Sequence, residues 1–381
     1  MIYLDNGATS FPKPPGVLEA VLAALSQPAS PGRSGHRPAH EAAKTVYRAR
    51  RNLGALLGFP NLERVAFTPN VTVAINLALN GFRFRAGDRI ISSALEHNSV
   101  ARPLKLLTET AGVIWDLVYP REDGLVHAAD FGKAIRPETR LAAVCHASNV
   151  TGAIAPAREI KEALGDIPLL LDVAQSAGSL SLGDLGSYAD LVAFTGHKGL
   201  LGPTGTGGLW IREGLPTRPL AVGGSGSRSE SLEHPDFLPD ALEAGTLNVH
   251  GLAGLAAGVD FILEKGAAAV RAGEMELLAT FLDALGAVPT ATVLGRAIPI
   301  AKRVATVSLN LRGWSSSDLA ARLEKDYGIM TRAGLHCAPL AHRAMGTFPG
   351  GAVRFSFGAF NSPGEALEAA RALAALGKEK N

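Results

Sequence analysis

The chain has 381 residues, which is more than a single hydrophobic core usually supports, so its length predicts two domains. Hydrophobic residues make up 47% of the sequence and charged residues 19%, a balance that excludes an intrinsically disordered chain. The formal net charge is +2 and no long basic run occurs, so the composition gives no case for a nucleic-acid partner. The two cysteines, Cys145 and Cys337, are too few for a disulfide framework and fit a reducing cytoplasm.

The first residues, MIYLDNGATS, lack the basic and apolar segments of a signal peptide. No window reaches the roughly 18 uninterrupted apolar residues that a membrane span needs. We therefore expect a cytoplasmic protein that does not bind a membrane.

Short apolar runs rich in β-branched residues alternate with helix-like stretches along the first half of the chain. Strands are predicted, in order, in VAFTPN, DRIISSA, VIWDLV, RLAAVCHAS, PLLLDVA and DLVAFTG. Helices are predicted at 41–58, 71–80, 98–111 and 156–165. This alternation is typical of an α/β fold with a largely parallel sheet and helices on both of its faces.

Notable polar residues follow several of the predicted strands. Ligands of parallel α/β sheets bind outside the carboxyl ends of the strands, where such residues come together. The sequence therefore predicts a site at this edge, formed by Asn70, Thr72, His97, Asn149, Asp172 and Lys198.

The pattern changes near residue 250, where a long helical stretch extends to about 290. It is followed by two strand-like segments, a helix between them, and a final amphipathic helix from about 363. We predict a large domain of 12–254 and a smaller α+β domain of 255–381 that includes residues 1–11. Segment 223–246 has no periodicity, and long loops inside compact proteins are usually functional.

The glycine-rich runs and the ten histidines do not match the common nucleotide or metal motifs. No Walker A motif and no G-x-G-x-x-G between a strand and a helix is present. The pair His36 and His40 lacks a supporting acid, and His336, Cys337 and His342 do not have a common zinc spacing. We expect no metal site.

Lys198 lies in the glycine-rich segment TGHKGLLGPTG, 26 residues after Asp172 at the end of a predicted strand. An isolated lysine would most often be a solvated surface amine. Here the flanking glycines allow a planar ligand to approach the backbone. A lysine that forms a Schiff base with an aldehyde and an aspartate that keeps a pyridine nitrogen protonated are what pyridoxal phosphate requires. The two residues favour a site for this cofactor.

Several segments of the chain resemble one family, in the expected order. They are YLDNGATS, SNVTGAI, DVAQSAG, TGHKGLLGPTG, RAGLHCAPL and VRFSFGAFN, and they extend over nearly the whole chain. The sequence resembles the cysteine desulfurases, in the class V aminotransferase group of fold type I pyridoxal phosphate enzymes, and is nearest to the SUF-type branch. The resemblance implies a fold type I large domain with a mostly parallel, seven-stranded type of sheet, a cytoplasmic homodimer, and pyridoxal 5'-phosphate as cofactor.

The resemblance implies roles for individual residues. Lys198 would carry the cofactor aldehyde, Asp172 would hold the ring nitrogen, and Gln175 would contact the ring hydroxyl. His97 would stack on the ring, although a helix-capping histidine explains it as well. The phosphate would be bound by residues at a helix N-terminus and near Lys198: Asn70, Val71, Thr72, Thr195 and His197.

Further residues would bind the substrate or the neighbouring subunit. Asn149 would lie near the cofactor hydroxyl and the substrate, although a turn asparagine is the alternative. Arg354 would bind the substrate carboxylate, since a guanidinium grips a carboxylate in two places. His36 is expected near the substrate. Thr246 would reach the phosphate of the partner subunit, although Leu247 replaces the proline common in the family.

Cys337 matches the sulfur-accepting cysteine of the family, with Arg332 and His336 close enough in sequence to favour its thiolate. Cys145 lies in an apolar strand and is expected to be inert. The chain departs from the family at three positions that concern selectivity: Leu335 replaces a histidine, Val71 a threonine, and Ser34 an arginine.

The expected activity is conversion of L-cysteine to L-alanine with a persulfide on Cys337, which would supply a sulfur-acceptor protein for iron–sulfur clusters or other products. L-Selenocysteine is an alternative substrate. Selenocysteine lyase, cysteine lyase and aminotransferase are alternative activities on the same fold. A scaffold without catalysis has no need for Lys198, Asp172, Arg354 and Cys337 together.

Overall fold

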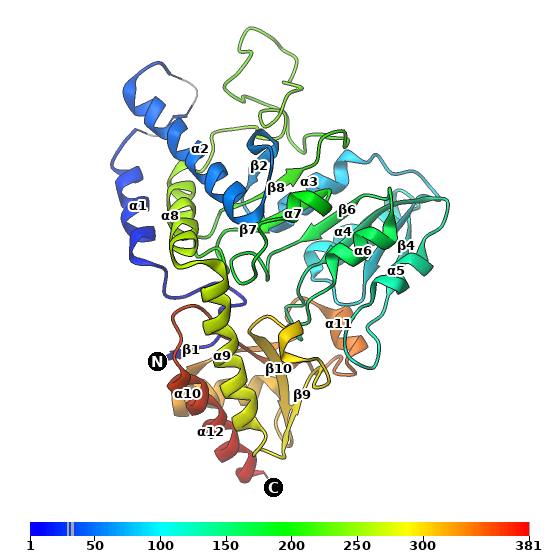
Figure 1. Ribbon diagram of the computed structural model, residues 1–381, viewed down its shortest axis with the longest axis vertical. Helices are drawn as coiled ribbons and strands as arrows, with labels where there is room; N and C mark the ends of the chain where they lie inside the picture. The colour runs from blue at the N-terminus through cyan, green and yellow to red at the C-terminus, as the bar shows by residue number, and fades with distance from the viewer. Residues whose placement is uncertain (29, 32–33, 381) are drawn as a thin grey trace.

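The computed structural model describes residues 1–28, 30–31 and 34–380. A seven-stranded sheet forms the centre of the larger, upper body in Figure 1. The pairs β7–β6, β6–β5, β5–β3 and β3–β4 are parallel, whereas β8 pairs antiparallel with both β2 and β7. The expected, mostly parallel sheet is confirmed. Its strands are, in spatial order, β2 (Val65–Thr68), β8 (Gly207–Ile211), β7 (Leu191–Thr195), β6 (Leu169–Asp172), β5 (Thr139–Cys145), β3 (Arg89–Ser93) and β4 (Ile114–Val118).

Alternating residues of each central strand enter two different hydrophobic cores, as the period of two in a strand requires. Leu169 and Leu171 of β6 lie in one core, and Leu170 between them lies in the other. The first core includes buried residues of α2 (Arg37–Leu57), α6 (Ala157–Leu164) and α8 (Val249–Lys265), and the second those of α3 (Val71–Gly81) and α4 (Asn98–Thr110). Helices therefore cover both faces. The remaining helices of this body are α1 (Pro15–Leu25), α5 (Ala128–Ala134) and α7 (Leu185–Tyr188).

Strand β8 is the element of this sheet that the sequence patterns do not predict. Its first two residues are Gly207 and Gly208, and both are buried. A Cβ on Gly207 would lie 2.8 Å from Asn70 backbone atoms, and one on Gly208 would lie 2.5 Å from the Phe194 ring. The two glycines thus allow β8 to fit between β2 and β7.

A second body contains an antiparallel sheet of β12 (Arg332–Gly334), β13 (Ala352–Ser356), β10 (Thr306–Leu311) and β9 (Ala291–Val293). It lies at the bottom of Figure 1, where both chain termini are found. Leu4 is buried in its core, and β1 (Ile2–Tyr3) pairs with β11 (Ile329–Met330). The N-terminal residues thus pack against this second body. The helices here are α9 (Ala267–Leu285), α10 (Ser316–Tyr327), α11 (Pro339–Ala344) and α12 (Pro363–Glu379).

The domain boundary predicted at residue 254 falls inside α8. Buried α8 side chains as far as Ile262 belong to the core of the large sheet, and Gly266 separates α8 from α9. The long helix predicted over 250–290 is therefore two helices. A boundary near Gly266 fits the buried side chains better, and the division into two domains stays a prediction.

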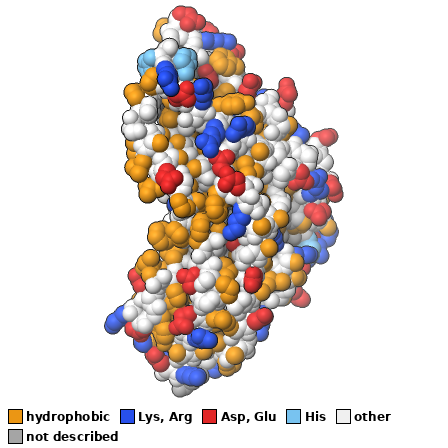
Figure 2. All heavy atoms as spheres, turned by 60° about the vertical axis from the view of Figure 1, so that its left-hand side comes forward, with side chains coloured by type: hydrophobic (Ala, Val, Ile, Leu, Met, Phe, Trp, Pro, Cys, Tyr) orange, Lys and Arg blue, Asp and Glu red, His pale blue; other side chains and the backbone are white. Residues whose placement is uncertain are grey.

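Two observations concern the surface. Across the described ranges, none of the helices combines the length and the apolar character needed to cross a membrane. The helix α1 exposes Leu18, Leu22 and Leu25, which are spaced to lie on one helix face and are 64%, 56% and 57% exposed. Figure 2 shows hydrophobic side chains gathered on the side of the molecule that carries α1.

Candidate active site

The residues that the sequence placed after strand ends come from one edge of the large sheet. Strands β2, β3, β5, β6 and β7 run in the same direction, so their carboxyl ends meet at this edge. The segment after β7 returns as β8 and keeps its loop at the same edge. The side chains collected there include Asn70, Thr72, His97, Asn149, Asp172, Gln175 and Lys198.

Asp172 and Lys198 provide opposite charges in this site. Asp172 is 5% exposed, and one of its carboxylate oxygens accepts the backbone N–H of Ala174 at 2.9 Å. Burial raises the pKa of Asp172, against the Ala174 hydrogen bond and the charge of Lys198. Burial lowers the pKa of Lys198 to about 8, although the Asp172 charge opposes the change. The lowered pKa makes the uncharged, nucleophilic form of the Lys198 amine easier to reach near neutral pH.

His97 is a helix cap and a neutral ring at once. Its Nδ1 accepts the backbone N–H of Ser99 at 3.0 Å, at the start of α4. Burial, and then the positive charges of Lys198 and Arg332, lower the pKa of His97 to about 3. Because Nδ1 accepts a hydrogen bond, the proton of the neutral ring is on Nε2. Both interpretations of this histidine, as a cap and as a ring facing the site, are compatible with this geometry.

The start of α3 provides a place for an anion. Asn70 caps the helix by accepting the N–H of Val73 at 3.1 Å, and the Thr72 hydroxyl lies 2.7 Å from that of Ser99. Val71, which replaces a threonine, is 7% exposed and packs in the apolar core. A helix N-terminus attracts an anion through its free N–H groups and its dipole. Thr195 adds a buried hydroxyl, which donates to the Thr206 carbonyl at 3.4 Å.

Three buried polar atoms at the site have no hydrogen-bond partner in the described structure: Asn149 Oδ1, His197 Nδ1 and Arg354 Nε. Such atoms are costly to bury without a partner, so they indicate where a polar ligand fits. Gln175 lies among them, with its Nε2 donating to the Gly7 carbonyl at 3.0 Å. An acid, an amine of lowered pKa, an anion-binding helix start and unpartnered polar atoms are the groups that pyridoxal phosphate needs.

Arg354 is fully buried on β13 of the smaller body. Its Nη1 donates to the Asn149 carbonyl at 3.3 Å, and its Nη2 donates to Asp5 Oδ1 at 2.5 Å. Gly7 covers the guanidinium so closely that a Cβ there would lie 3.2 Å from Arg354 Cζ. Sequence reasoning missed Asp5, although it is part of the matching segment YLDNGATS.

Cys337 is a free, exposed cysteine. Its Sγ accepts a hydrogen bond from Arg332 Nη2 at 3.3 Å, so the expected proximity of Arg332 is confirmed. Its carbonyl accepts the N–H of Asn98 at 2.7 Å, next to His97. The other cysteine, Cys145, is buried, and burial raises its pKa well above the usual range.

His336 does not assist the thiol in the way the sequence suggested. Its side chain is buried, with Nε2 3.0 Å from the Arg332 carbonyl and Nδ1 3.1 Å from His342 Nε2. His342 Nδ1 in turn lies 2.8 Å from the Thr347 hydroxyl. Both rings stay neutral at pH 7, because burial lowers the pKa of each, that of His336 to about 3. These hydrogen bonds link His336, the neighbour of Cys337 in its loop, to His342 and through it to Thr347.

Two predicted residues lie outside this group. His36 is an exposed cap of α2, where its Nδ1 accepts the N–H of Ala39 at 3.2 Å, and Ser34 is exposed beside it. Thr246 is exposed and lines a separate cavity of about 350 Å³ together with Thr68 and Val73. Within the described residues, no contact joins either of them to Lys198 or Arg354.

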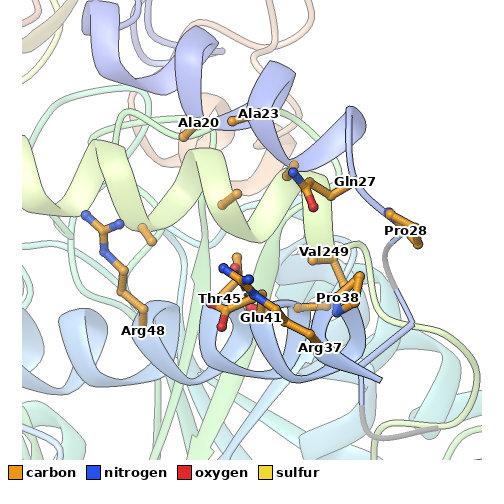
Figure 3. Close-up of a pocket in the computed structure, with 14 residues that line it drawn as sticks. Ala20, Ala23, Gln27, Pro28, Arg37, Pro38, Glu41, Thr45, Arg48 and Val249 are labelled. Carbon is orange, nitrogen blue, oxygen red and sulfur yellow. Dashed lines mark hydrogen bonds between the residues drawn. The ribbon is translucent and has the colours of Figure 1, made fainter. Parts of the chain in front are cut away.

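A hollow of about 720 Å³ lies between α1, α2 and α8 (Figure 3). Its floor includes alanines of α1 and α8, and Arg37, Glu41 and Arg48 of α2 lie along its side. The cavity that contains Lys198 is much smaller, about 30 Å³, and is also lined by Gln175 and Gly7. The chemistry is therefore concentrated away from the larger hollow.

The chain is similar to known proteins in both sequence and structure. The family model described as aminotransferase class-V matches residues 2–367. A probable cysteine desulfurase of Methanothermobacter thermautotrophicus is 31% identical over 96% of this chain and 92% of its own length. One from Pyrococcus abyssi is 32% identical over 95% of this chain and 90% of its own.

Solved structures agree. The apo cysteine desulfurase of Thermococcus onnurineus superimposes with a TM-score of 0.92 at 32% identity, over 99% of this chain and 95% of that one. The cysteine desulfurase CsdA of Escherichia coli gives a TM-score of 0.88 at 26% identity, over 99% of this chain and 94% of that one. The chain therefore belongs to the aminotransferase class-V family, within its group of cysteine desulfurases, as the sequence motifs predict. The match to fold type I pyridoxal phosphate enzymes is confirmed with it.

Proposed function

We propose that this protein is a pyridoxal-phosphate-dependent cysteine desulfurase that converts L-cysteine to L-alanine and leaves the sulfur as a persulfide on Cys337. The observation that carries the proposal is the pairing of an exposed thiol, supported by the Arg332 guanidinium, with a buried lysine of lowered pKa opposite a buried acid. A simple aminotransferase needs the lysine and the acid but no nucleophilic thiol.

The residues present fit the cofactor. Asp172 would hold the ring nitrogen, Gln175 the ring hydroxyl and Lys198 the aldehyde. Thr72 and the first amides of α3 would bind the phosphate, with His197 and Thr195 beside them. When bound, pyridoxal phosphate supplies an electrophilic aldehyde and a ring that accepts electrons from the substrate carbon.

Each protein group has a task in the reaction. Arg354 binds the substrate carboxylate, and the unpartnered Oδ1 of Asn149 can accept a hydrogen bond from an N–H or O–H of the ligand. Lys198 would remove the α-proton of the substrate, for which an amine of pKa about 8 is well suited. His97 presents its Nε2–H side as a neutral ring.

The sulfur of the substrate is transferred to Cys337 by nucleophilic displacement. The Cys337 thiolate attacks the sulfur of the substrate, a sulfur–sulfur bond forms, and the carbon–sulfur bond breaks with its electron pair left on carbon. The β-carbon then gains a proton and alanine leaves. Arg332 donates a hydrogen bond to the Cys337 sulfur and so orients it for the attack.

The same proposal includes two partners. The exposed leucines of α1 favour a homodimer, because contiguous apolar surface of this kind is commonly covered by another chain. The persulfide of an exposed cysteine can be collected by an acceptor protein, for iron–sulfur clusters or other sulfur-containing products. Thr246 and His36, which are exposed on one chain, would act on the partner's site.

Mass spectrometry of Cys337 after addition of L-cysteine tests the proposal. We expect a 1:1 persulfide adduct on Cys337 together with one equivalent of alanine, and a slow second phase that small thiol reductants accelerate. Pyruvate, ammonia and sulfide without an adduct would indicate a cysteine lyase instead, because elimination of sulfide leaves aminoacrylate, which hydrolyses to pyruvate. 3-Mercaptopyruvate as the main product would indicate an aminotransferase, because transamination leaves the carbon–sulfur bond intact. Parallel assays with L-selenocysteine decide the preference between the two substrates.

A further inference from the structure

Asp5 belongs to an N-terminal segment that forms hydrogen bonds with two parts of the site. The N–H of Ser356, beside Arg354, donates to the Leu4 carbonyl at 2.8 Å, which seats the segment along β13. Farther on, the Ser10 hydroxyl donates to the Lys198 carbonyl at 2.9 Å. Asp5 is thus held at the point where the segment passes between Arg354 and the Lys198 loop.

The Asp5 carboxylate has one oxygen engaged and one free. Oδ1 accepts the hydrogen bond from Arg354 Nη2, whereas Oδ2 has no hydrogen-bond partner among the described residues. The side chain of Asp5 is 20% exposed, while that of Arg354 is fully buried. The acid is therefore the more accessible half of the ion pair, with an acceptor oxygen left over.

The charge of Asp5 acts on both ends of the proposed amino-acid site. It is paired with Arg354, and it is also among the charges that raise the pKa of Lys198 against the larger effect of burial. A substrate that places its carboxylate at Arg354 and brings its nitrogen to Lys198 must therefore lie within the field of Asp5.

We propose that Asp5 is a specificity-determining residue that, together with Arg354, selects α-amino acids in their zwitterionic form. Arg354 attracts the carboxylate, with its unpartnered Nε among the donors available. The free oxygen of Asp5 attracts the ammonium group on arrival. The inference rests on the proposed function, because it concerns the amino-acid substrate of the same site.

The selectivity follows from charge arithmetic. A plain carboxylate that binds Arg354 brings a second negative charge beside Asp5 and has no positive group to offset the repulsion. A zwitterion brings a positive charge that offsets this repulsion. At a partly buried site such a difference in interaction energy corresponds to about a tenfold preference in affinity for the zwitterion.

The test uses a pair of molecules of nearly equal shape that cannot react with the cofactor aldehyde. N,N-Dimethylglycine is a zwitterion with a tertiary amine, and isovalerate has a carbon in place of its nitrogen. We would measure the dissociation constants of both by calorimetry on the holoenzyme, with competition by L-cysteine to locate them at the site. The wild type should bind dimethylglycine about tenfold more tightly than isovalerate.

Asp5→Asn should remove this preference, and Asp5→Glu should retain most of it. Asp116→Asn is the matched control, because Asp116 forms an ion pair with Arg89 in the large sheet and its side chain has a similar exposure of 21%. This substitution should leave the preference for dimethylglycine unchanged. Equal affinities in the wild type would overturn the proposal even if Asp5→Asn did not fold. An Asp5→Asn protein that weakens both ligands equally would also overturn it, because that is the result of a purely structural ion pair.

These binding constants do not depend on turnover. A wild type that shows the preference but forms no alanine from cysteine would refute the proposed function and leave the role of Asp5 standing. A wild type that forms alanine but binds dimethylglycine and isovalerate equally would support the proposed function and refute the role of Asp5.

Discussion

The His336–His342 pair makes the loop of Cys337 sensitive to acid, and the size of the effect can be worked out. His336 is 2% exposed, and its pKa is lowered from 6.5 to about 3, mainly by burial and then by the charge of Arg354. In the unfolded chain the ring takes up a proton as the pH falls below 6.5, whereas in the folded protein it stays neutral. The stability associated with His336 is therefore complete above pH 6.5 and is lost as the pH falls from there toward 3.

Between pH 7 and pH 5 the loss amounts to about 2 kcal/mol, since roughly 1.5 pH units below the unfolded pKa each contribute about 1.4 kcal/mol. The perturbation is His336→Gln, which keeps a hydrogen-bonding side chain but removes the titration. Urea unfolding of both proteins at pH 7 and pH 5 gives four free energies of unfolding. The histidines that do not contact His336 contribute equally to both proteins and cancel, so the double difference reports His336 together with its hydrogen-bonded partner His342.

We expect the wild type to lose about 2 kcal/mol more than His336→Gln between the two pH values. The intrinsic cost of the substitution cancels as well, because it is present at both pH values. Equal losses in the two proteins would refute the reasoning, since they would mean that His336 titrates normally in the folded state and is not held neutral by its surroundings.

Three further substitutions address the chemistry directly. Lys198→Ala should remove both the visible absorbance of the bound cofactor and the formation of alanine; turnover comparable to the wild type would contradict its role. Cys337→Ser should keep the absorbance changes on adding cysteine but form no alanine, and unchanged alanine formation would show that no enzyme persulfide is needed. Arg332→Gln should slow alanine formation while leaving the absorbance changes on adding cysteine intact, because it removes the group that donates a hydrogen bond to Cys337 Sγ and so orients it. An unchanged rate would show that the 3.3 Å contact has no effect on reactivity.

Much of the large domain is predictable from local pattern. The strands that became β2 to β7 are short, largely apolar runs, and the central strands β3, β5, β6 and β7 bury alternate side chains in two cores. The order of these elements along the chain requires their carboxyl ends to meet at one edge, which is why Asp172 and Lys198 could be placed together. Strand β8 escapes this reasoning because its glycines have no apolar side chain and its role depends on space beside Asn70 and Phe194.

The contacts within the site could not be predicted from the sequence, because they too depend on three-dimensional packing. Motifs locate Arg354 and Cys337, but they do not say what a side chain contacts in three dimensions. The Arg354–Asp5 pair joins residues 349 positions apart, and the turning of His336 toward His342 depends on the burial of both rings. Likewise, the break between α8 and α9 rests on one residue, Gly266, inside a stretch whose apolar pattern is continuous.

The long reach of the Asp5–Arg354 pair has a consequence for how the protein is made. Asp5 emerges from the ribosome 349 residues before its partner Arg354. The large sheet can begin to fold while the chain is still growing, as N-terminal domains generally do. The carboxylate-binding half of the site cannot form until β13 has emerged. A nascent chain is thus without a complete amino-acid site, and a product truncated before Arg354 would retain Lys198 and Asp172 but could not hold the substrate by its carboxylate.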